Sequence, residues 1–337
     1  MSEIPSGRRL PSSAGPRPEA IKAIPVRHPW RWVAAIVVFL VAADVVYMIS
    51  RSIAEDRTSS GPGWVAVAHY FTAPFILRGV VVTIALTVLA MVIGVTLGLV
   101  LAVMRLSANP VVSSISWIYI WFFRGTPVLV QIFFWFNLNV VLHDIGLGLP
   151  GTPIFFSLGH TNSLITPFMA VVLGLGLNEA AYMAEIVRAG IISVEQGQTE
   201  AAQALGMTRL LVMRRIVLPQ AMRVIIPPTG NETISMLKTS SLAFVVGSVR
   251  DVFTTADQIS LTTFAIIEMA IVASIWYLIM TTILTIGQYY VERYFARGSQ
   301  RQLPPTPLQR FGRLLFTFHA PPPGPVEVPV SVGHEHR

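Results

Sequence analysis

A small set of polar residues lies within long apolar segments, and these residues are the ones most able to do chemistry. They are Arg124, Glu179, Glu185, Lys238, Thr239 and Ser240. A charged side chain inside a membrane is costly unless it faces protein or water, so such residues are typical of a path for a polar solute. Lys238 is the strongest candidate, because polar groups continue from it through Ser241. The alternative is that the charges pair to hold helices together, as Glu185 and Arg188 could at i,i+3.

Catalytic and metal-binding patterns are absent from the sequence. The pair Lys238-Thr239 follows an apolar leucine and lacks the glycine loop that binds phosphates in ATPases. No Gly-x-Ser-x-Gly motif occurs, no apolar segment carries histidines four residues apart, and the chain has no cysteine. We therefore expect no metal, no cofactor and no ATP hydrolysis by this chain alone.

Composition indicates a membrane protein. Hydrophobic residues make up 53% of the 337 residues and charged residues only 12%, which is typical of a chain that crosses a membrane several times. The formal net charge is +7, carried almost entirely by arginines in loops and tails. Such arginines fit contact with anionic membrane lipid better than binding to nucleic acid, which we do not expect.

Several apolar segments are predicted to cross the membrane. In chain order they are about 33–49, 79–104, 111–142, 164–188, 222–246 and 263–290. The third is too short for two crossings and too long for one straight helix, so we expect a span bent at residues 124–127, where a proline lacks its N–H. The fifth is expected to be interrupted by the prolines and glycine of residues 227–230. Gly94 and Gly98 in the second form a small face suited to close helix packing.

Basic residues are concentrated in segments that would all lie on one side of the membrane. These segments are the leader 1–30, the central loop that follows residue 188, and the tail that follows residue 290. Because basic loops stay on the cytoplasmic side, both termini and the central loop are predicted to be cytoplasmic, with 143–163 and 247–262 as outside loops. The leader 1–30 and the Pro- and Arg-rich tail 298–337 are expected to be disordered.

A short helix is predicted in the central loop, within residues 193–221. Thr199 can cap its N-terminus, and Gly206 can end it in the left-handed conformation. Ala201 and Ala202 keep the helix thin, so that the surface of another protein can approach closely.

These loop residues resemble the cytoplasmic signature of bacterial ABC-importer permeases. The matching positions are Glu-Ala-Ala at 200–202, the glycine at 206, and Ile-Val-Leu-Pro at 216–219. Further segments resemble permeases for polar amino acids of the histidine, glutamine, glutamate or arginine type. These are Leu-Arg-Gly at 77–79 with Thr83, Arg-Gly-Thr-Pro-Val-Leu-Val-Gln at 124–131, 180–190, and Lys-Thr-Ser-Ser-Leu at 238–242.

The resemblance implies an all-α polytopic membrane protein with the type I ABC-importer permease fold. Its five-helix core would be the permease domain, residues 75–297, and residues 31–50 would add one N-terminal transmembrane helix. The chain would be the permease subunit of an ATP-driven importer in the bacterial plasma (inner) membrane. The implied partners are separate ABC ATPase subunits, an extracytoplasmic amino-acid-binding protein, a second permease subunit, identical or different, and membrane lipid.

The resemblance also implies roles for single residues. The loop helix would dock on the ATPase through Glu200, Ala201, Ala202, Leu205, Gly206, Arg209 and Pro219. An amino-acid zwitterion needs a donor for its carboxylate, which Arg124 or Lys238 could supply, and an acceptor for its ammonium, which Glu179 could supply. The alternative is an ion-coupled secondary amino-acid transporter. That class favours an internal inverted repeat, and the two halves of this sequence show no convincing one.

Overall fold

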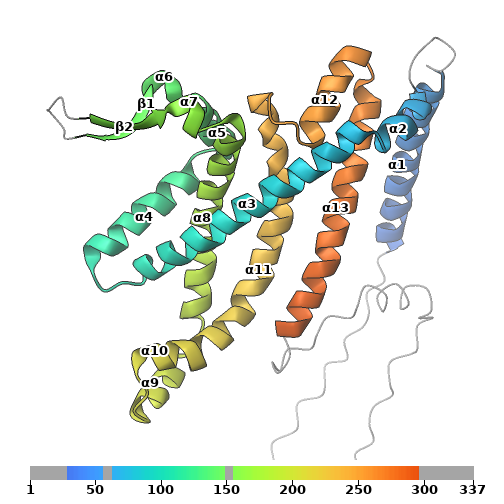
Figure 1. Ribbon diagram of the computed structural model, residues 1–337. Coiled ribbons are helices and arrows are strands. Elements are labelled where there is room, and N and C mark those ends of the chain that lie inside the picture. Colours follow the sequence, from blue (N-terminus) through green and yellow to red (C-terminus); the bar gives the residue numbers. More distant parts are fainter. Residues whose placement is uncertain (1–28, 56–62, 149–154, 296–337) are drawn as a thin grey trace, which may run out of the picture. The chain divides into compact units, whose positions relative to one another are not determined.

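The computed structural model describes residues 29–55, 63–148 and 155–295, and these are almost wholly helical (Figure 1). The chain divides into two compact units, with the boundary at Gly63. The first unit holds one described helix, α1, Pro29–Glu55, which is apolar around its circumference and exposed along its length. It covers the predicted first span. The expected disordered leader and tail lie outside the described residues, apart from the start of α1.

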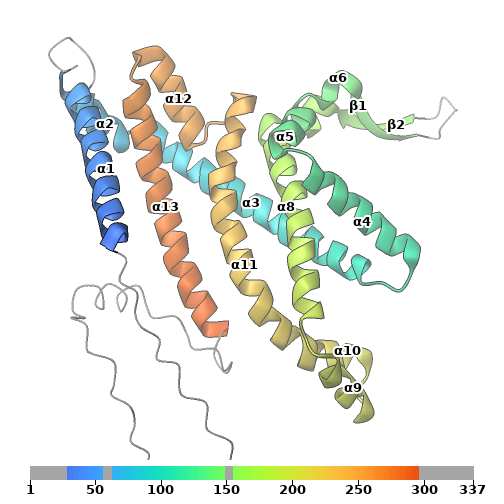
Figure 2. The ribbon, with the colours of Figure 1, turned by 180° about the vertical axis from the view of Figure 1, so that it is seen from behind.

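The second unit is a helical assembly with one small hairpin (Figures 1 and 2). Its longer helices are α2 Gly63–Phe71, α3 Pro74–Arg105, α4 Pro110–Gly125, α5 Val128–Phe136, α8 Pro167–Ile192, α9 Gln196–Ala204, α11 Leu218–Thr239, α12 Val252–Thr263 and α13 Ile266–Phe295. Its shorter elements are α6 Leu138–Val141, β1 Asp144–Gly148, β2 Phe155–His160, α7 Thr161–Leu164, α10 Arg209–Val212, a π-helical turn Met213–Val217 and a 3-10 helix Ser240–Val246. The all-α class is therefore confirmed, with the hairpin as an unpredicted addition.

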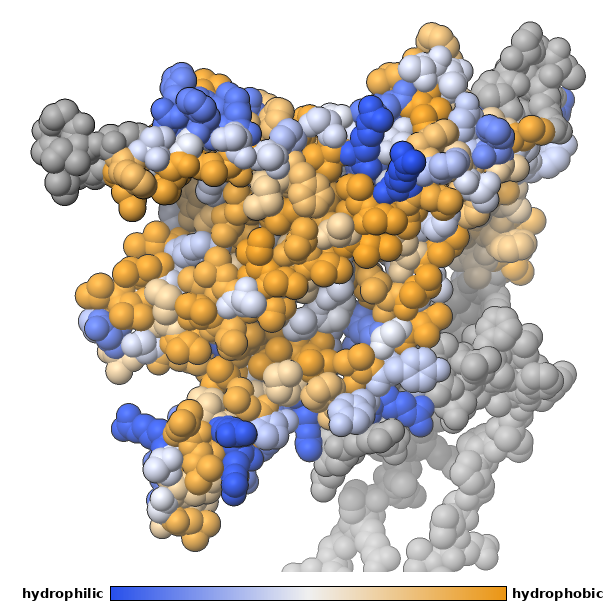
Figure 3. Space-filling view, in the orientation of Figure 1, coloured by the Kyte–Doolittle hydropathy of each residue, from blue (hydrophilic) through white to orange (hydrophobic). Residues whose placement is uncertain are grey.

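The helices form an apolar band between two hydrophilic ends (Figure 3). By length and composition, four described helices could cross a membrane, α1, α3, α8 and α13, and five if the bent pair α4–α5 is one span. The expected fifth span, α11, does not meet the same measure because its sequence alternates apolar residues with arginine, threonine, glutamate and lysine. Composition thus supports one span fewer than the six that were predicted.

Helix α3 packs closely along α8 through glycines. A Cβ added at Gly98 would lie 2.6 Å from the Cβ of Met183, so no larger residue fits there without moving a helix. The predicted close-packing face of α3 is therefore confirmed. At its other end α8 packs against α11, where a Cβ added at Gly190 would lie 2.3 Å from Cγ1 of Ile225.

Helices α4 and α5 meet at an angle of 99°, as expected from the proline between them. Pro127 has no N–H, so the carbonyl of Phe123 loses its helical partner. Side chains replace it: Asn178 Nδ2 donates to that carbonyl at 2.8 Å, and Gln131 Nε2 donates at 3.0 Å. The predicted bend is confirmed, and it is a fixed corner.

The predicted interruption at residues 227–230 is wrong, because α11 runs through both prolines. Two missing N–H groups remove only two helical bonds, and α13 supports the helix at this point. Gln288 on α13 donates to the carbonyl of Pro227 at 3.3 Å and packs so closely on Gly230 that an added Cβ would lie 2.7 Å from its Cδ. At this point the packing of α13 on α11 outweighs the tendency of proline to break a helix.

The described parts of the two expected outside loops contain regular secondary structure. Residues 247–262 contain most of α12, whose first turn is capped by Asp251. The Asp251 side chain accepts from the N–H groups of Phe253 and Thr254, each at 3.1 Å, and from the hydroxyl of Tyr277 on α13 at 3.1 Å. The residue is fully buried. Within 143–163, β1 and β2 form an antiparallel pair with an irregularity at Ile145 and Gly146.

Candidate functional site: a polar pocket and a cytoplasmic-loop helix

A pocket of about 610 Å³ lies between the α4–α5 corner, α8 and α11. It is lined by Arg124, Gly125, Thr126, Pro127, Val128, Asn178, Glu179, Tyr182, Glu232, Ser235, Met236 and Thr239. We call it the polar pocket. It brings together three of the predicted path residues, Arg124, Glu179 and Thr239, which are far apart in the sequence. The fixed corner positions its α4–α5 wall.

Glu179 is the buried acceptor of the polar pocket. Its side chain is only 3% exposed, and its Oε1 has no hydrogen-bond partner among the described residues. Burying a polar atom without a partner is costly, so this oxygen is available to a water molecule or a ligand in the pocket. Gly94 on α3 makes room for it, since an added Cβ there would lie 2.4 Å from Cγ of Glu179.

Arg124 supplies the cationic group of the polar pocket. Its guanidinium carbon lies 5.1 Å from the ring centroid of Tyr182 on α8, a cation–π contact that joins the end of α4 to α8. The contact holds the guanidinium without using its N–H donors. Those donors therefore remain available for a carboxylate, which an arginine binds in a bidentate manner.

Glu232 adds a second carboxyl group to the polar pocket and was not among the predicted path residues. It lies on α11 with Ser235 and Thr239, at spacings of three and four residues, so the three share one face of the helix. That spacing is a signal from which it could have been found. On α8, Tyr182 lies three residues after Glu179 and four after Asn178, so it shares a helix face with each of them.

The other predicted path residues lie elsewhere. Glu185 pairs with Arg188, Nη2 to Oε2 at 2.7 Å, so the structural alternative holds for it. Ser240 is buried and donates to the carbonyl of Leu237 at 2.7 Å. Lys238 is exposed and does not line the polar pocket.

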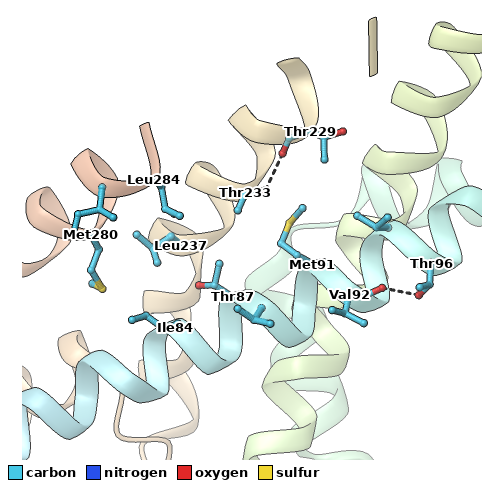
Figure 4. A pocket seen from close by; sticks show the side chains of 13 residues that line it. Ile84, Thr87, Met91, Val92, Thr96, Thr229, Thr233, Leu237, Met280 and Leu284 are labelled. Atoms are coloured by element: carbon cyan, nitrogen blue, oxygen red, sulfur yellow. Dashed lines mark hydrogen bonds between the residues drawn. The ribbon is translucent and has the colours of Figure 1, made fainter. Parts of the chain in front are cut away.

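A second cavity, of about 570 Å³, lies between α3, α11 and α13 and is apolar (Figure 4). Its threonine hydroxyls bond to carbonyls of their own helices, as Thr96 does with Val92 at 2.6 Å and Thr233 with Thr229 at 2.9 Å. Methyl and methylene groups are left to line it. It offers no group for a zwitterion, so the polar pocket is the better candidate for a polar ligand.

The predicted loop helix is α9, and its C-terminus has the expected geometry. Gly206 has φ +80°, in the left-handed region. The N–H of Gly206 donates to the carbonyl of Gln203 at 2.9 Å, and that of Met207 to Ala202 at 3.1 Å, which is the Schellman pattern. The predicted cap by Thr199 is wrong, because the helix begins earlier, with Glu195 at the N-cap position.

The predicted coupling residues lie on different sides of α9. Ala202 is buried against Val212 and Val217, so it holds the helix in place. Ala201 and Leu205 are exposed, with Leu205 84% exposed. Glu200 and Arg209 line a cavity of about 450 Å³ behind the helix.

Pro219, the last predicted coupling residue, is the second residue of α11. A proline there cannot donate to the carbonyl four residues earlier, and its ring crowds that carbonyl. The chain widens into the π-helical turn Met213–Val217 just before it. π-helical turns are rare and occur often at functional sites. This one joins the α9–α10 loop to the helix that lines the polar pocket.

The sequence profile of the family described as binding-protein-dependent transport system inner membrane component matches residues 94–297. The chain belongs to this family. The matched residues include the polar pocket and the whole α9–α10 loop. The polar pocket and the α9–α10 loop therefore both lie within the part of the chain that defines the family.

Individual relatives are similar over most of the chain. The arginine transport system permease protein ArgU of Corynebacterium glutamicum is 45% identical over 303 residues, which cover 90% of this chain and 91% of that protein. The arginine transport system permease protein ArtQ of Bacillus subtilis is 37% identical over 220 residues, 65% of this chain and 92% of that protein. The permease class is thereby confirmed over the ion-coupled alternative.

Solved structures agree on the fold. A crystal structure of an amino acid ABC transporter with histidines superposes with a TM-score of 0.58 at 35% identity, covering 68% of this chain and 98% of that one. An inward-facing MetNI methionine ABC transporter superposes with a TM-score of 0.51 at 17% identity, covering 66% of this chain and 97% of that one. The expected type I importer fold is confirmed.

Proposed function

We propose that this permease carries cationic amino acids, with arginine as the leading candidate, through the polar pocket. The observation that supports this most is the set of ionisable groups there: two carboxyl groups, Glu179 and Glu232, and one guanidinium, Arg124. Lysine and arginine carry two positive groups and one carboxylate at neutral pH. Pocket and substrate thus have complementary charges, and the two relatives described above are named for arginine transport.

Each group of the substrate has a partner in this proposal. Arg124, held over Tyr182, donates its N–H groups to the α-carboxylate. The unpartnered Oε1 of Glu179 accepts from one cationic group, and Glu232 on the facing helix accepts from the other. A neutral amino acid leaves one carboxylate unpaired, which costs binding free energy in a partly dehydrated site.

ATP hydrolysis takes place in separate ATPase subunits in this proposal, which contact the exposed side of α9. That side carries Gly197, Ala201 and Ala204, whose small side chains permit close approach, and Leu205 as an apolar anchor. The arginines of the central loop support a cytoplasmic position for this loop and for both termini, with the permease in the inner membrane of a bacterium. An extracytoplasmic amino-acid-binding protein delivers the substrate on the other side.

A second permease subunit, identical or different, completes the path in this proposal. Lys238 is exposed on α11, between the pocket-lining residues Ser235 and Thr239. An exposed lysine in this part of a membrane protein faces water or another protein chain rather than lipid. We place it at the boundary with the second subunit.

The test is uptake by the complete importer, reconstituted with its ATPase and binding protein. Glu179→Gln keeps the shape of the side chain and removes its charge, so arginine uptake should fall by about tenfold or more, as expected for a charge-assisted hydrogen bond worth about 1.5–3 kcal/mol. Glu185→Gln is the matched control on the same helix and should preserve substrate preference. Unchanged arginine uptake by the Glu179→Gln importer, with the complex intact, would contradict the proposal.

A further inference from the structure

The β1–β2 hairpin carries an apolar face that nothing in the described chain covers. Leu147 and Phe156 are directly opposite in the strand register, and Leu158 lies two residues further along β2, at the irregularity where it has no partner on β1. Their exposed fractions are 74%, 68% and 57%. The other side carries Gly146 opposite Ser157. Large apolar side chains thus gather on the side of Leu147 and Phe156, whereas the neighbouring pair Gly146 and Ser157 presents small residues to the other side.

The hairpin lies at the end of the second unit opposite the α9–α10 loop and projects sideways from the helices (Figures 1 and 2). Apolar side chains cover its side nearest the apolar band, and hydrophilic ones gather over the neighbouring outer end (Figure 3). Val140 and Val141 of the neighbouring helix α6 are also highly exposed. The apolar face of the hairpin thus lies near further exposed apolar residues.

The charge and the backbone of the hairpin indicate how deep in the bilayer it can lie. Residues 143–163 contain no arginine or lysine, and the Asp144 carboxylate lies 2.7 Å from Nδ1 of His160 across the strands. A two-stranded hairpin keeps an outer row of unpaired N–H and C=O groups on each strand, and these require water. The bilayer interface supplies both hydrocarbon and water, whereas the hydrocarbon core does not.

We propose that the hairpin is a lipid-binding element, which lies in the headgroup layer with Leu147, Phe156 and Leu158 turned toward the acyl chains. It would fix the depth of α5 and α8, which contribute to the wall of the polar pocket, relative to the membrane surface. The occupant of the apolar face is the bilayer itself rather than a docked protein.

The test uses single cysteines, since the chain has none of its own. Phe156→Cys and its neighbour Ser157→Cys are each labelled with an environment-sensitive fluorophore in the purified full-length permease, reconstituted in phosphatidylcholine vesicles. Lipids with a nitroxide near the headgroup should quench the label at 156 several-fold more strongly than the label at 157. Aqueous iodide should quench them in the reverse order.

Equal and strong iodide quenching at both positions, with no quenching by nitroxide lipids, would overturn the proposal. Protection at 156 that appears only when the amino-acid-binding protein is added would also overturn it and would assign the face to that partner. Protection that depends on permease density in the vesicles would assign it to a second copy. Leu147→Cys repeats the test on the other strand and guards against a local defect at Phe156.

Discussion

Gly94 lies directly against Glu179, so closely that an added Cβ would be 2.4 Å from Cγ of the glutamate and 2.8 Å from its Cβ. The carboxyl group that lines the polar pocket is therefore positioned by the absence of a side chain on the neighbouring helix. The contact also lies within the tight α3–α8 packing. A change at Gly94 should thus affect transport without touching any ionisable group.

Gly94→Ala should lower arginine uptake several-fold while the protein still inserts in the membrane. The added methyl group must move Glu179 or separate α3 from α8, and overpacking of this kind typically costs about 1–3 kcal/mol. Uptake and thermal unfolding in detergent measure the two effects. Gly287→Ala is the control, since nothing lies within 4 Å of its added Cβ and alanine favours a helix. Equal behaviour of the two variants would refute the positioning role.

Asp251→Ala should destabilise the second unit. The substitution removes the cap of α12 and leaves the hydroxyl of Tyr277 and two N–H groups without their buried acceptor. We expect a loss of about 2–3 kcal/mol, seen as a lower apparent melting temperature. Asp257→Ala changes an exposed aspartate on the same helix and should leave the melting temperature nearly unchanged.

Gly206→Val should weaken coupling to the ATPase, because a β-branched residue is strongly disfavoured at a φ of +80°. The Schellman closure of α9 would be lost, and with it the orientation of Leu205. Gly206→Asn is the matched control, since asparagine tolerates the left-handed conformation. ATPase co-purification and transport-coupled ATP hydrolysis are the measurements. If the valine variant matches the asparagine variant in both, the closure of α9 is not required for coupling.

The orientation of the permease can be tested by labelling with a membrane-impermeant thiol reagent. A cysteine at Ser157, in the hairpin, should react from outside intact cells. One at Gln198, on the exposed α9, should react only after the membrane is opened. The opposite pattern would place the arginine-rich loop outside and reverse the predicted topology.

Local chemistry predicted part of the site well. The corner at residues 124–127 follows from one proline, and the end of α9 from one glycine, because both depend on backbone geometry within a few residues. The pairing of Glu185 with Arg188 follows from helical spacing. These features are predictable from short segments because each depends only on residues that are close together in the sequence.

Features that depend on packing between distant segments were not predictable in the same way. The prolines of α11 do not break it, because Gln288, far along the chain, supports the helix at Pro227. Asp251 is a buried cap, although its polar neighbours in the sequence indicate a loop. Glu232 joins Glu179 and Arg124 only through the way α11 packs beside α8. The periodicity of polar and apolar residues within one segment does not indicate contacts between distant segments.

Helix α8 has a mechanical consequence. Glu179 lies near its middle, and the helix runs without a break to Ile192, four residues before α9 begins. From Glu179 to Ile192 the helix is roughly 20 Å long. A tilt of α8 by roughly 5° about the level of Glu179 would therefore shift the start of the loop by roughly 2 Å. At that end of α8, Gly190 packs closely against Ile225 of α11, so we expect α11 to move with α8. Helices α8 and α11, which carry Glu179 and Glu232, are thus mechanically coupled. A displacement of α9 would move both helices together.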